Sequence, residues 1–157
     1  DGHTAMSELA QKELNEEVFF ELCIQNVDKP PLSYHQIKKT LDQFNSSQNW
    51  VLTKAGKFSD KARLFPNSSF IIGADTLLRI FDERFYASRR EMIEEFEIFN
   101  VNNNKFLVFG REYKNKFIEL KDIQIPDSIK KLFRGFSENI FRKDISSSTI
   151  RAKNSEE

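Results

Sequence analysis

Apolar residues recur along the chain at two spacings, and the change of spacing predicts the order of the elements. Continuous apolar runs, which are typical of buried strands, occupy residues 18–27, 50–55, 69–75 and 104–112. Apolar residues three and four positions apart, which are typical of amphipathic helices, occupy residues 4–14, 32–44, 58–68, 76–86, 88–100, 127–133 and 146–153. Thr4 and Ser33 are candidate N-caps. Residues 114–126 are ambiguous and could hold a short strand.

Strands that alternate with helices, and that are apolar on both faces, favour a parallel sheet covered by helices on its two sides. The sequence shows no internal repeat and no long linker. We therefore expect one α/β domain over residues 1–151, with a Rossmann-like, doubly wound parallel sheet and a flexible polar tail at 152–157. Ligands of such sheets bind at the carboxyl ends of the strands.

Charge and cysteine content exclude several classes of function. The 24 basic and 24 acidic residues cancel and the isoelectric point is near 7.0, so we expect neither nucleic acid nor a membrane surface as partner. The single cysteine, Cys23, cannot form an internal disulfide, and this predicts a cytoplasmic location, with the nucleus as the alternative. No zinc-ligand spacing, P-loop or G-x-S-x-G motif is present.

Two candidate ligand residues directly follow predicted strands. Asp75 comes after the strand-ending Gly73 in "FIIGAD", where a carboxylate could bind the hydroxyls of a ribose or simply cap a helix that starts at Thr76. Arg111 follows "FLVFG" and could be either a phosphate ligand or a surface charge.

The two ends of the chain carry candidate phosphate ligands. Ser146, Ser147 and Ser148 lie in the first turn of the last predicted helix, and Arg151 lies about one turn beyond. Backbone N–H groups, hydroxyls and a guanidinium could hold a phosphate there, although the chemistry alone favours plain helix capping by the serines. His3 opens the first predicted helix and could donate to a phosphate or lie unused at the surface.

The order of these motifs resembles the nucleotidylyltransferase superfamily, most closely its nicotinamide-nucleotide adenylyltransferase-like branch. The chain carries "GH" at a helix start, "FIIGAD", "GR" after the next strand, and "ISSSTIR" near its end. The longest similar stretch is "LFPNSSFIIGADTLLRIFDERFY", at residues 64–86.

The resemblance implies roles for these residues. Gly2 and His3 match the second half of the family's [HT]-x-G-H motif, whose histidine binds the ATP phosphates and stabilises the transition state. Gly73 and Asp75 match the G-x-D that contacts the adenosine ribose, and Arg111 is a looser match to a basic residue. The motif that holds the β- and γ-phosphates is matched by Ser146, Ser147, Ser148 and Arg151.

Two departures from the family pattern stand out. Ser148 replaces a threonine and keeps its hydroxyl. The first strand and the first His or Thr of [HT]-x-G-H are absent, because the family places them directly before the position of Asp1. We expect those residues to exist upstream, since a parallel sheet without its central strand leaves edges unpaired.

The implied reaction transfers the adenylyl group of ATP to a phosphate and releases pyrophosphate. His3 and Arg151 would be the catalytic residues, Mg²⁺ would arrive with ATP, and a homo-oligomer is left open. Nicotinamide mononucleotide is the first choice of acceptor and phosphopantetheine the second. The alternative from another class is a non-catalytic module that binds a nucleotide or a partner with the same fold.

Overall fold

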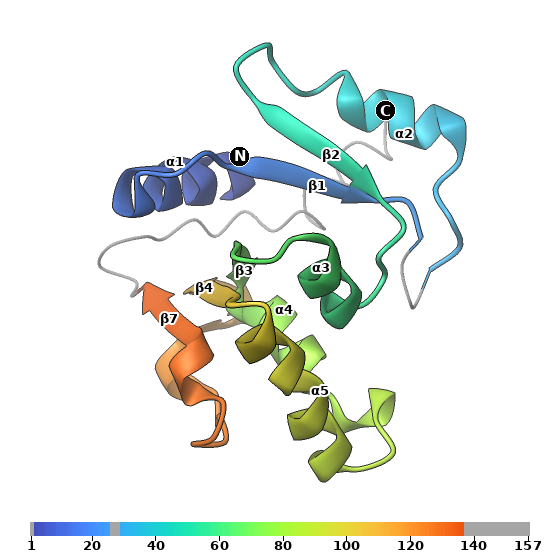
Figure 1. Cartoon of the computed structure of the whole chain (residues 1–157). Helices are drawn as coiled ribbons and strands as arrows, with labels where there is room; N and C mark the ends of the chain where they lie inside the picture. Colours follow the sequence, from blue (N-terminus) through green and yellow to red (C-terminus); the bar gives the residue numbers. More distant parts are fainter. Residues whose placement is uncertain (1, 26–28, 137–157) are drawn as a thin grey trace.

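Helices and strands alternate in the computed structural model, which describes residues 2–25 and 29–136 (Figure 1). The α-helices in these ranges are α1 (Gly2–Leu14), α2 (Tyr34–Leu41), α3 (Phe58–Leu64), α4 (Ala74–Ile80) and α5 (Arg89–Val101). The strands are β1 (Phe19–Cys23), β2 (Asn49–Thr53), β3 (Ser69–Gly73), β4 (Lys105–Phe109), β5 (Arg111–Tyr113), β6 (Lys116–Ile118) and β7 (Phe133–Phe136). None of these helices is long and apolar enough to cross a bilayer.

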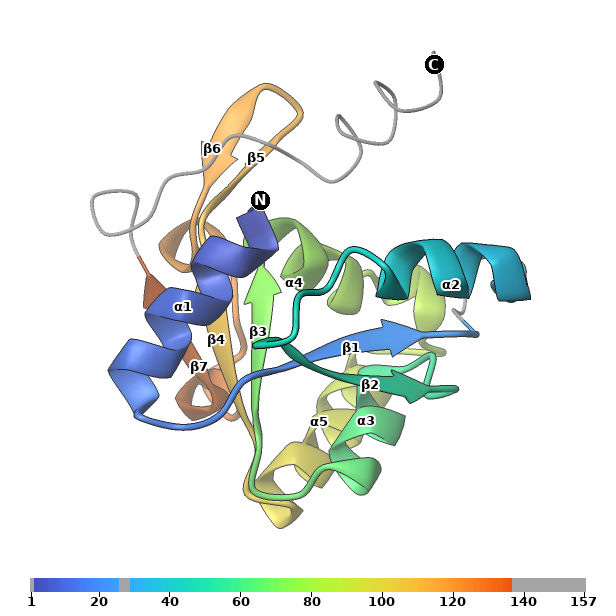
Figure 2. The same ribbon diagram turned by 90° about the horizontal axis from the view of Figure 1, so that it is seen from above.

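The predicted mixed α/β class with parallel strands is confirmed. β3, β4 and β7 form a parallel sheet with β4 in the middle, and β1 pairs with β2 in a second parallel sheet. β5 and β6 form an antiparallel hairpin. β1 and β2 run across the direction of β3 (Figure 2), and the parallel strands of the described residues form two sheets rather than one. One edge of β1 and one edge of β3 therefore lack a neighbouring strand within the described residues.

Helices cover both faces of the β3–β4–β7 sheet. Because side chains alternate along a strand, Leu107 and Phe109 of β4 point to one face, where they pack with Met6 and Ala10 of α1. Phe106 and the other alternate residues point to the opposite face and pack against α3, α4 and α5. Figure 2 shows α1 antiparallel to β3, so the N-terminus of α1 lies toward the carboxyl end of that strand.

Phenylalanines dominate the larger of the two hydrophobic clusters. Phe96, Phe99 and Phe106 are fully buried, and the ring centroids of Phe99 and Phe106 lie 4.9 Å apart. Phe133 of β7 stacks on Phe106 at 5.1 Å. Such aromatic contacts add stability beyond the apolar area they bury, which gives the high phenylalanine content a structural role.

Of the two predicted N-caps, the structure confirms Ser33 and corrects Thr4. Ser33 caps α2, as predicted, in a capping box with Gln36. The prediction that Thr4 caps the first helix is wrong, because α1 already begins at Gly2 and the Thr4 carbonyl accepts a hydrogen bond from the Ser7 hydroxyl inside the helix.

Three predicted boundaries are corrected by the structure. The strand predicted at 104–112 divides at Gly110 into β4 and β5, and β6 lies within the ambiguous range 114–126. The helix predicted at 76–86 ends at Ile80. The helix predicted at 127–133 is replaced by a 3₁₀ turn, followed by β7, because the sheet offers β4 as a partner for this short segment.

Candidate functional site

Three of the residues singled out in the sequence lie together at the carboxyl ends of β3 and β4. Gly73 is the last residue of β3 and is in register with Phe109, the last residue of β4. Asp75 lies in the first turn of α4, and Arg111 begins β5 directly beyond β4. The Asp75 Oδ1 atom is 3.9 Å from the Arg111 Nε atom. Gly73, Asp75 and Arg111 are called the strand-end cluster below.

Gly73 makes the strand-end cluster fit sterically. A Cβ atom at this position would lie 2.3 Å from the Asp75 Oδ1 atom and 2.8 Å from the Arg111 Cγ atom. The φ angle of Gly73 is −80°, which any residue adopts. The glycine is therefore needed for space between the two charged side chains, and not for its backbone freedom.

Arg111 carries a buried donor that has no acceptor among the residues the structure describes. Its side chain is 7% exposed, and within the described part of the chain its Nη1 atom has no hydrogen-bond partner. The 3.9 Å approach to Asp75 is too long for a hydrogen bond. A buried donor left unpaired costs about 1–3 kcal/mol. An anionic ligand that supplied an acceptor here would remove that cost.

Asp75 lies in the first turn of α4 and does not cap that helix. α4 begins at Ala74, its N-cap is Gly73, and no side chain makes a cap hydrogen bond there. The alternative that Asp75 caps a helix starting at Thr76 is thus wrong. The Asp75 side chain is 37% exposed, so its carboxylate is accessible to hydroxyl donors from solution.

The structure describes the predicted site residues near the N-terminus but not those near the C-terminus. Gly2 is buried and His3 is exposed in the first turn of α1, whose N-terminus lies toward the carboxyl end of β3 (Figure 2). The remaining candidates, Ser146, Ser147, Ser148 and Arg151, lie outside the described residues, as does the tail at 152–157.

A cavity of about 300 Å³ lies beside α4. Thr76, the neighbour of Asp75 along the chain, lines it, together with residues of α3 and α5 and the segment that follows α4. Four phenylalanines contribute to its walls: Phe58, Phe85, Phe96 and Phe99. Its volume is at the lower end of the range for small-molecule sites, which are mostly apolar with few polar groups.

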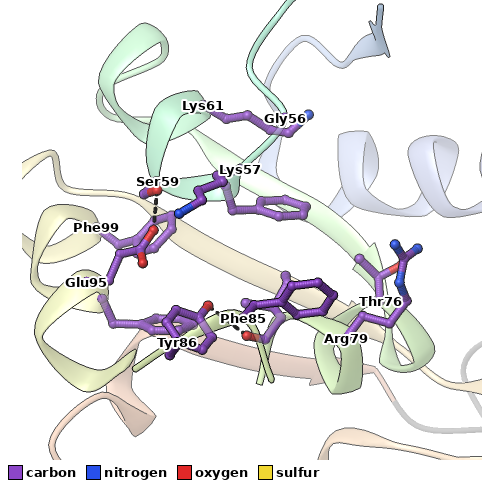
Figure 3. Close-up of a pocket in the computed structure, with 13 residues that line it drawn as sticks. Gly56, Lys57, Ser59, Lys61, Thr76, Arg79, Phe85, Tyr86, Glu95 and Phe99 are labelled. Atoms are coloured by element: carbon purple, nitrogen blue, oxygen red, sulfur yellow. Dashed lines mark hydrogen bonds between the residues drawn. The ribbon is translucent and has the colours of Figure 1, made fainter. Parts of the chain in front are cut away.

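Hydrogen bonds orient Ser59, Glu95 and Tyr86 in the cavity wall (Figure 3). The Ser59 hydroxyl donates to the Glu95 Oε1 atom. The Tyr86 hydroxyl donates to the Ile80 carbonyl at 2.8 Å. Burial raises the pKa of Tyr86 to about 12, and the nearby charge of Glu95 adds to the increase. The Lys57 amino group points toward Glu95 in the same view.

Sequence reasoning missed this cavity, although one signal for it was present. Met92, Phe96 and Phe99 form the buried stripe of α5, and Glu95 shares that stripe because residues at i, i+3, i+4 and i+7 lie on one helix face. A carboxylate on a buried stripe indicates a polar partner or a ligand. The pairing with Ser59, 36 residues away, depends on the packing of α3 on α5.

The residues described at 2–25 and 29–136 include no group of three or more His, Cys, Asp or Glu side chains arranged to hold a metal ion. An Mg²⁺ ion that is carried by nucleotide phosphates needs few protein ligands.

In comparisons with known proteins, no protein-family model, no curated protein and no solved structure matches the chain.

Proposed function

We propose that the protein is an adenylyltransferase that transfers the adenylyl group of ATP to the phosphate of a mononucleotide, with nicotinamide mononucleotide as the favoured acceptor. The observation that carries this proposal is the strand-end cluster, in which the buried Arg111 guanidinium has a nitrogen with no acceptor in the described ranges 2–25 and 29–136. The position also fits a Rossmann-like, doubly wound arrangement, whose ligands bind at the carboxyl ends of parallel strands.

Each member of the strand-end cluster has a role in binding ATP. The Asp75 carboxylate accepts hydrogen bonds from the ribose hydroxyls, and the Arg111 guanidinium binds a phosphate oxygen. Gly73 leaves the space in which both side chains approach the nucleotide. By the resemblance, His3 binds the phosphates near α1, while Ser146, Ser147, Ser148 and Arg151 hold the β- and γ-phosphates.

The reaction requires no protein nucleophile. An oxygen of the acceptor phosphate attacks the α-phosphorus of ATP and forms a new P–O bond. The bond from the α-phosphorus to the oxygen that bridges to the β-phosphorus breaks, and pyrophosphate leaves. The protein contributes positioning and stabilisation of the negative charge that develops on the phosphates. The Arg111 guanidinium would supply part of that stabilisation, together with His3 as a hydrogen-bond donor.

The cavity beside α4 supports a mononucleotide acceptor over phosphopantetheine. Thr76 lines the cavity and directly follows Asp75 along the chain, so the cavity and the strand-end cluster both border α4. Aromatic walls favour a planar ring through stacking and edge contacts, and phosphopantetheine has no ring to place between them.

Pyrophosphate release tests the proposal. The protein is incubated with ATP, Mg²⁺ and nicotinamide mononucleotide, and reactions without acceptor serve as blanks. We expect acceptor-dependent release in the wild type, and an increase of about tenfold or more in the KM for ATP in Arg111→Lys, because lysine keeps the charge but loses the planar fork of donors. Arg63→Lys, at an exposed position on α3, is the matched control and should behave as wild type.

Two results would contradict the proposal in different ways. ATP binding in a calorimetric titration, without turnover on any acceptor, would favour the non-catalytic nucleotide-binding module. No ATP binding, or equal ATP affinity in wild type and Arg111→Lys, would remove the strand-end cluster from nucleotide recognition.

A further inference from the structure

We propose that the β5–β6 hairpin extends the strand-end cluster into a nucleotide site, in which the Tyr113 ring stacks on the base while Arg111 binds a phosphate. The inference rests on the proposed function, because it takes the strand-end cluster as the place where nucleotide phosphates bind. It goes further by assigning recognition of the base to a residue that no sequence motif marks.

One face of the hairpin carries both residues. Side chains alternate along a strand, so Arg111 and Tyr113 of β5 point to the same face and Glu112 points to the other. Lys116 of β6 is in register with Tyr113 and therefore shares its face. On this face the Arg111 side chain approaches Asp75 of α4. The face that carries the Tyr113 ring is thus continuous with the strand-end cluster.

The hairpin holds this face in a restrained position beyond the carboxyl end of β4 (Figure 2). Its two strands are joined by Lys114 and Asn115, whose φ angles are 50° and 61°, as in the two-residue turns that fix the register of a hairpin. At its base the Phe117 ring packs against Gly110, where a Cβ atom would lie 2.6 Å from the Phe117 Cζ atom. The turn and this contact together restrain β5, and with it the Tyr113 ring.

The chemistry of the face matches an anion that carries a flat ring. The buried Nη1 atom of Arg111 has no acceptor among the described residues, and phosphate oxygens are strong acceptors for a guanidinium. Tyr113 is 37% exposed, and an aromatic side chain can stack on any base because every base has a π-face. Two residues along a strand span about 6.6 Å, so a ligand that joins a ring to phosphates through a ribose can contact both side chains.

The Tyr113 ring has a partner in the protein that a base can replace. The Lys114 amino group lies 5.2 Å from the centroid of the Tyr113 ring. Both residues are exposed, and a cation–π contact at an exposed site is weak. Stacking of a base on an aromatic side chain is stronger, and the lysine stem is flexible. The contact with Lys114 therefore leaves the ring available to a ligand.

Calorimetric titrations with ATP and with inorganic tripolyphosphate, in the presence of Mg²⁺ and without an acceptor, test the role of the ring. Both ligands have three linked phosphates, but only ATP has a base. We expect Tyr113→Ala to weaken ATP binding about tenfold or more, because one stacked base is lost, and to leave tripolyphosphate binding unchanged. Tyr113→Phe keeps the ring and should bind ATP as the wild type does. Arg111→Lys should weaken the binding of both ligands, because it alters the phosphate contact.

The matched control is Tyr34→Ala. Tyr34 is 81% exposed and lies on α2, away from the hairpin (Figure 2), so its removal should leave both affinities unchanged. Circular dichroism and a thermal melt establish that the variants are folded. A folded Tyr113→Ala protein with the wild-type affinity for ATP would overturn the inference. An equal loss of affinity for ATP and tripolyphosphate would also overturn it, since the ring would then not act on the base.

Pyrophosphate release separates this inference from the proposed function. If ATP binding depends on Tyr113 as expected but no acceptor supports pyrophosphate release, the adenylyltransferase proposal fails and the base site stands. If wild type and Tyr113→Ala release pyrophosphate with the same KM for ATP, the adenylyltransferase stands and Tyr113 has no part in base recognition. No binding of ATP to the wild type would overturn both.

Discussion

Arg111 illustrates at the scale of a single residue how a stable fold can keep a locally unfavourable group. Its guanidinium is almost fully buried, with one nitrogen unpaired among the described residues. Folding alone would favour a neutral side chain at such a position, because an unpaired buried donor costs free energy. The cost is understandable if a phosphate completes the hydrogen bonding.

Tyr86 gives a second prediction at the scale of a single residue, about how the stability of the protein depends on pH. The phenol has a pKa of about 12 in the folded protein, against an ordinary value of 10.0. The folded protein therefore binds the Tyr86 proton more tightly than the unfolded chain does. The contribution of Tyr86 to the free energy of unfolding is complete below pH 10 and is lost as the pH rises toward 12. The free energy of unfolding should fall with pH in that window.

Urea unfolding of wild type and Tyr86→Phe at several pH values between 8 and 11.5 checks this prediction. We expect the variant to be less stable by about 1 kcal/mol at pH 8, because the hydrogen bond to the Ile80 carbonyl is lost. The difference should shrink as the pH rises above 10. A difference that stays constant over the whole range would show that Tyr86 does not titrate differently in the folded protein.

At the scale of elements, one ion pair connects the β1–β2 sheet to the rest of the molecule. Glu21 of β1 accepts from the Thr53 hydroxyl of β2 and pairs with the Lys61 amino group of α3. The Lys61 side chain is 9% exposed and that of Glu21 is 25% exposed. Removing one partner leaves the other charge poorly solvated, which is more costly than losing a surface pair.

Lys61→Met should therefore lower the free energy of unfolding by about 2–3 kcal/mol, measured by urea denaturation. Adding Glu21→Gln to that variant should recover part of the loss, because no lone charge then remains. Arg63→Met on the same helix removes an exposed pair with Asp60 and should cost less than about 1 kcal/mol. Equal losses in the two single variants would mean that the Lys61–Glu21 pair contributes no more stability than the exposed Arg63–Asp60 pair.

The element order and the strand-end cluster could be predicted from sequence, whereas β7 and the cavity could not. Apolar periodicity reports burial, so runs such as 69–75 were visible as strands. Residues that follow neighbouring parallel strands share one edge of the sheet, which brings Asp75 and Arg111 together. β7 has only four residues, with Arg134 and Gly135 exposed in its middle, so its pattern is too short to read. The cavity depends on helix packing, which no local pattern encodes.

At the scale of the whole molecule, the two parallel sheets should differ in stability. β4 lies between two strands and its last four residues are buried. β1 and β2 have one partner strand each within the described residues, and Trp50 and Leu52 of β2 are 44% and 37% exposed. Regions with little buried apolar surface open with a smaller free energy than the core does.

Amide hydrogen exchange of the native protein would reveal this difference. We expect amides of β4 to exchange only through global unfolding, and amides of β1 and β2 to exchange at least about 100-fold faster through local opening. The partly buried Lys61–Glu21 pair links the two parts, so Lys61→Met should accelerate exchange in β1 and β2 relative to β4. A common exchange rate for β1, β2 and β4 that shifts uniformly in the variant would contradict this prediction. The two sheets would then unfold as a single cooperative unit, and the strand-end cluster would open with the same free energy as β1 and β2.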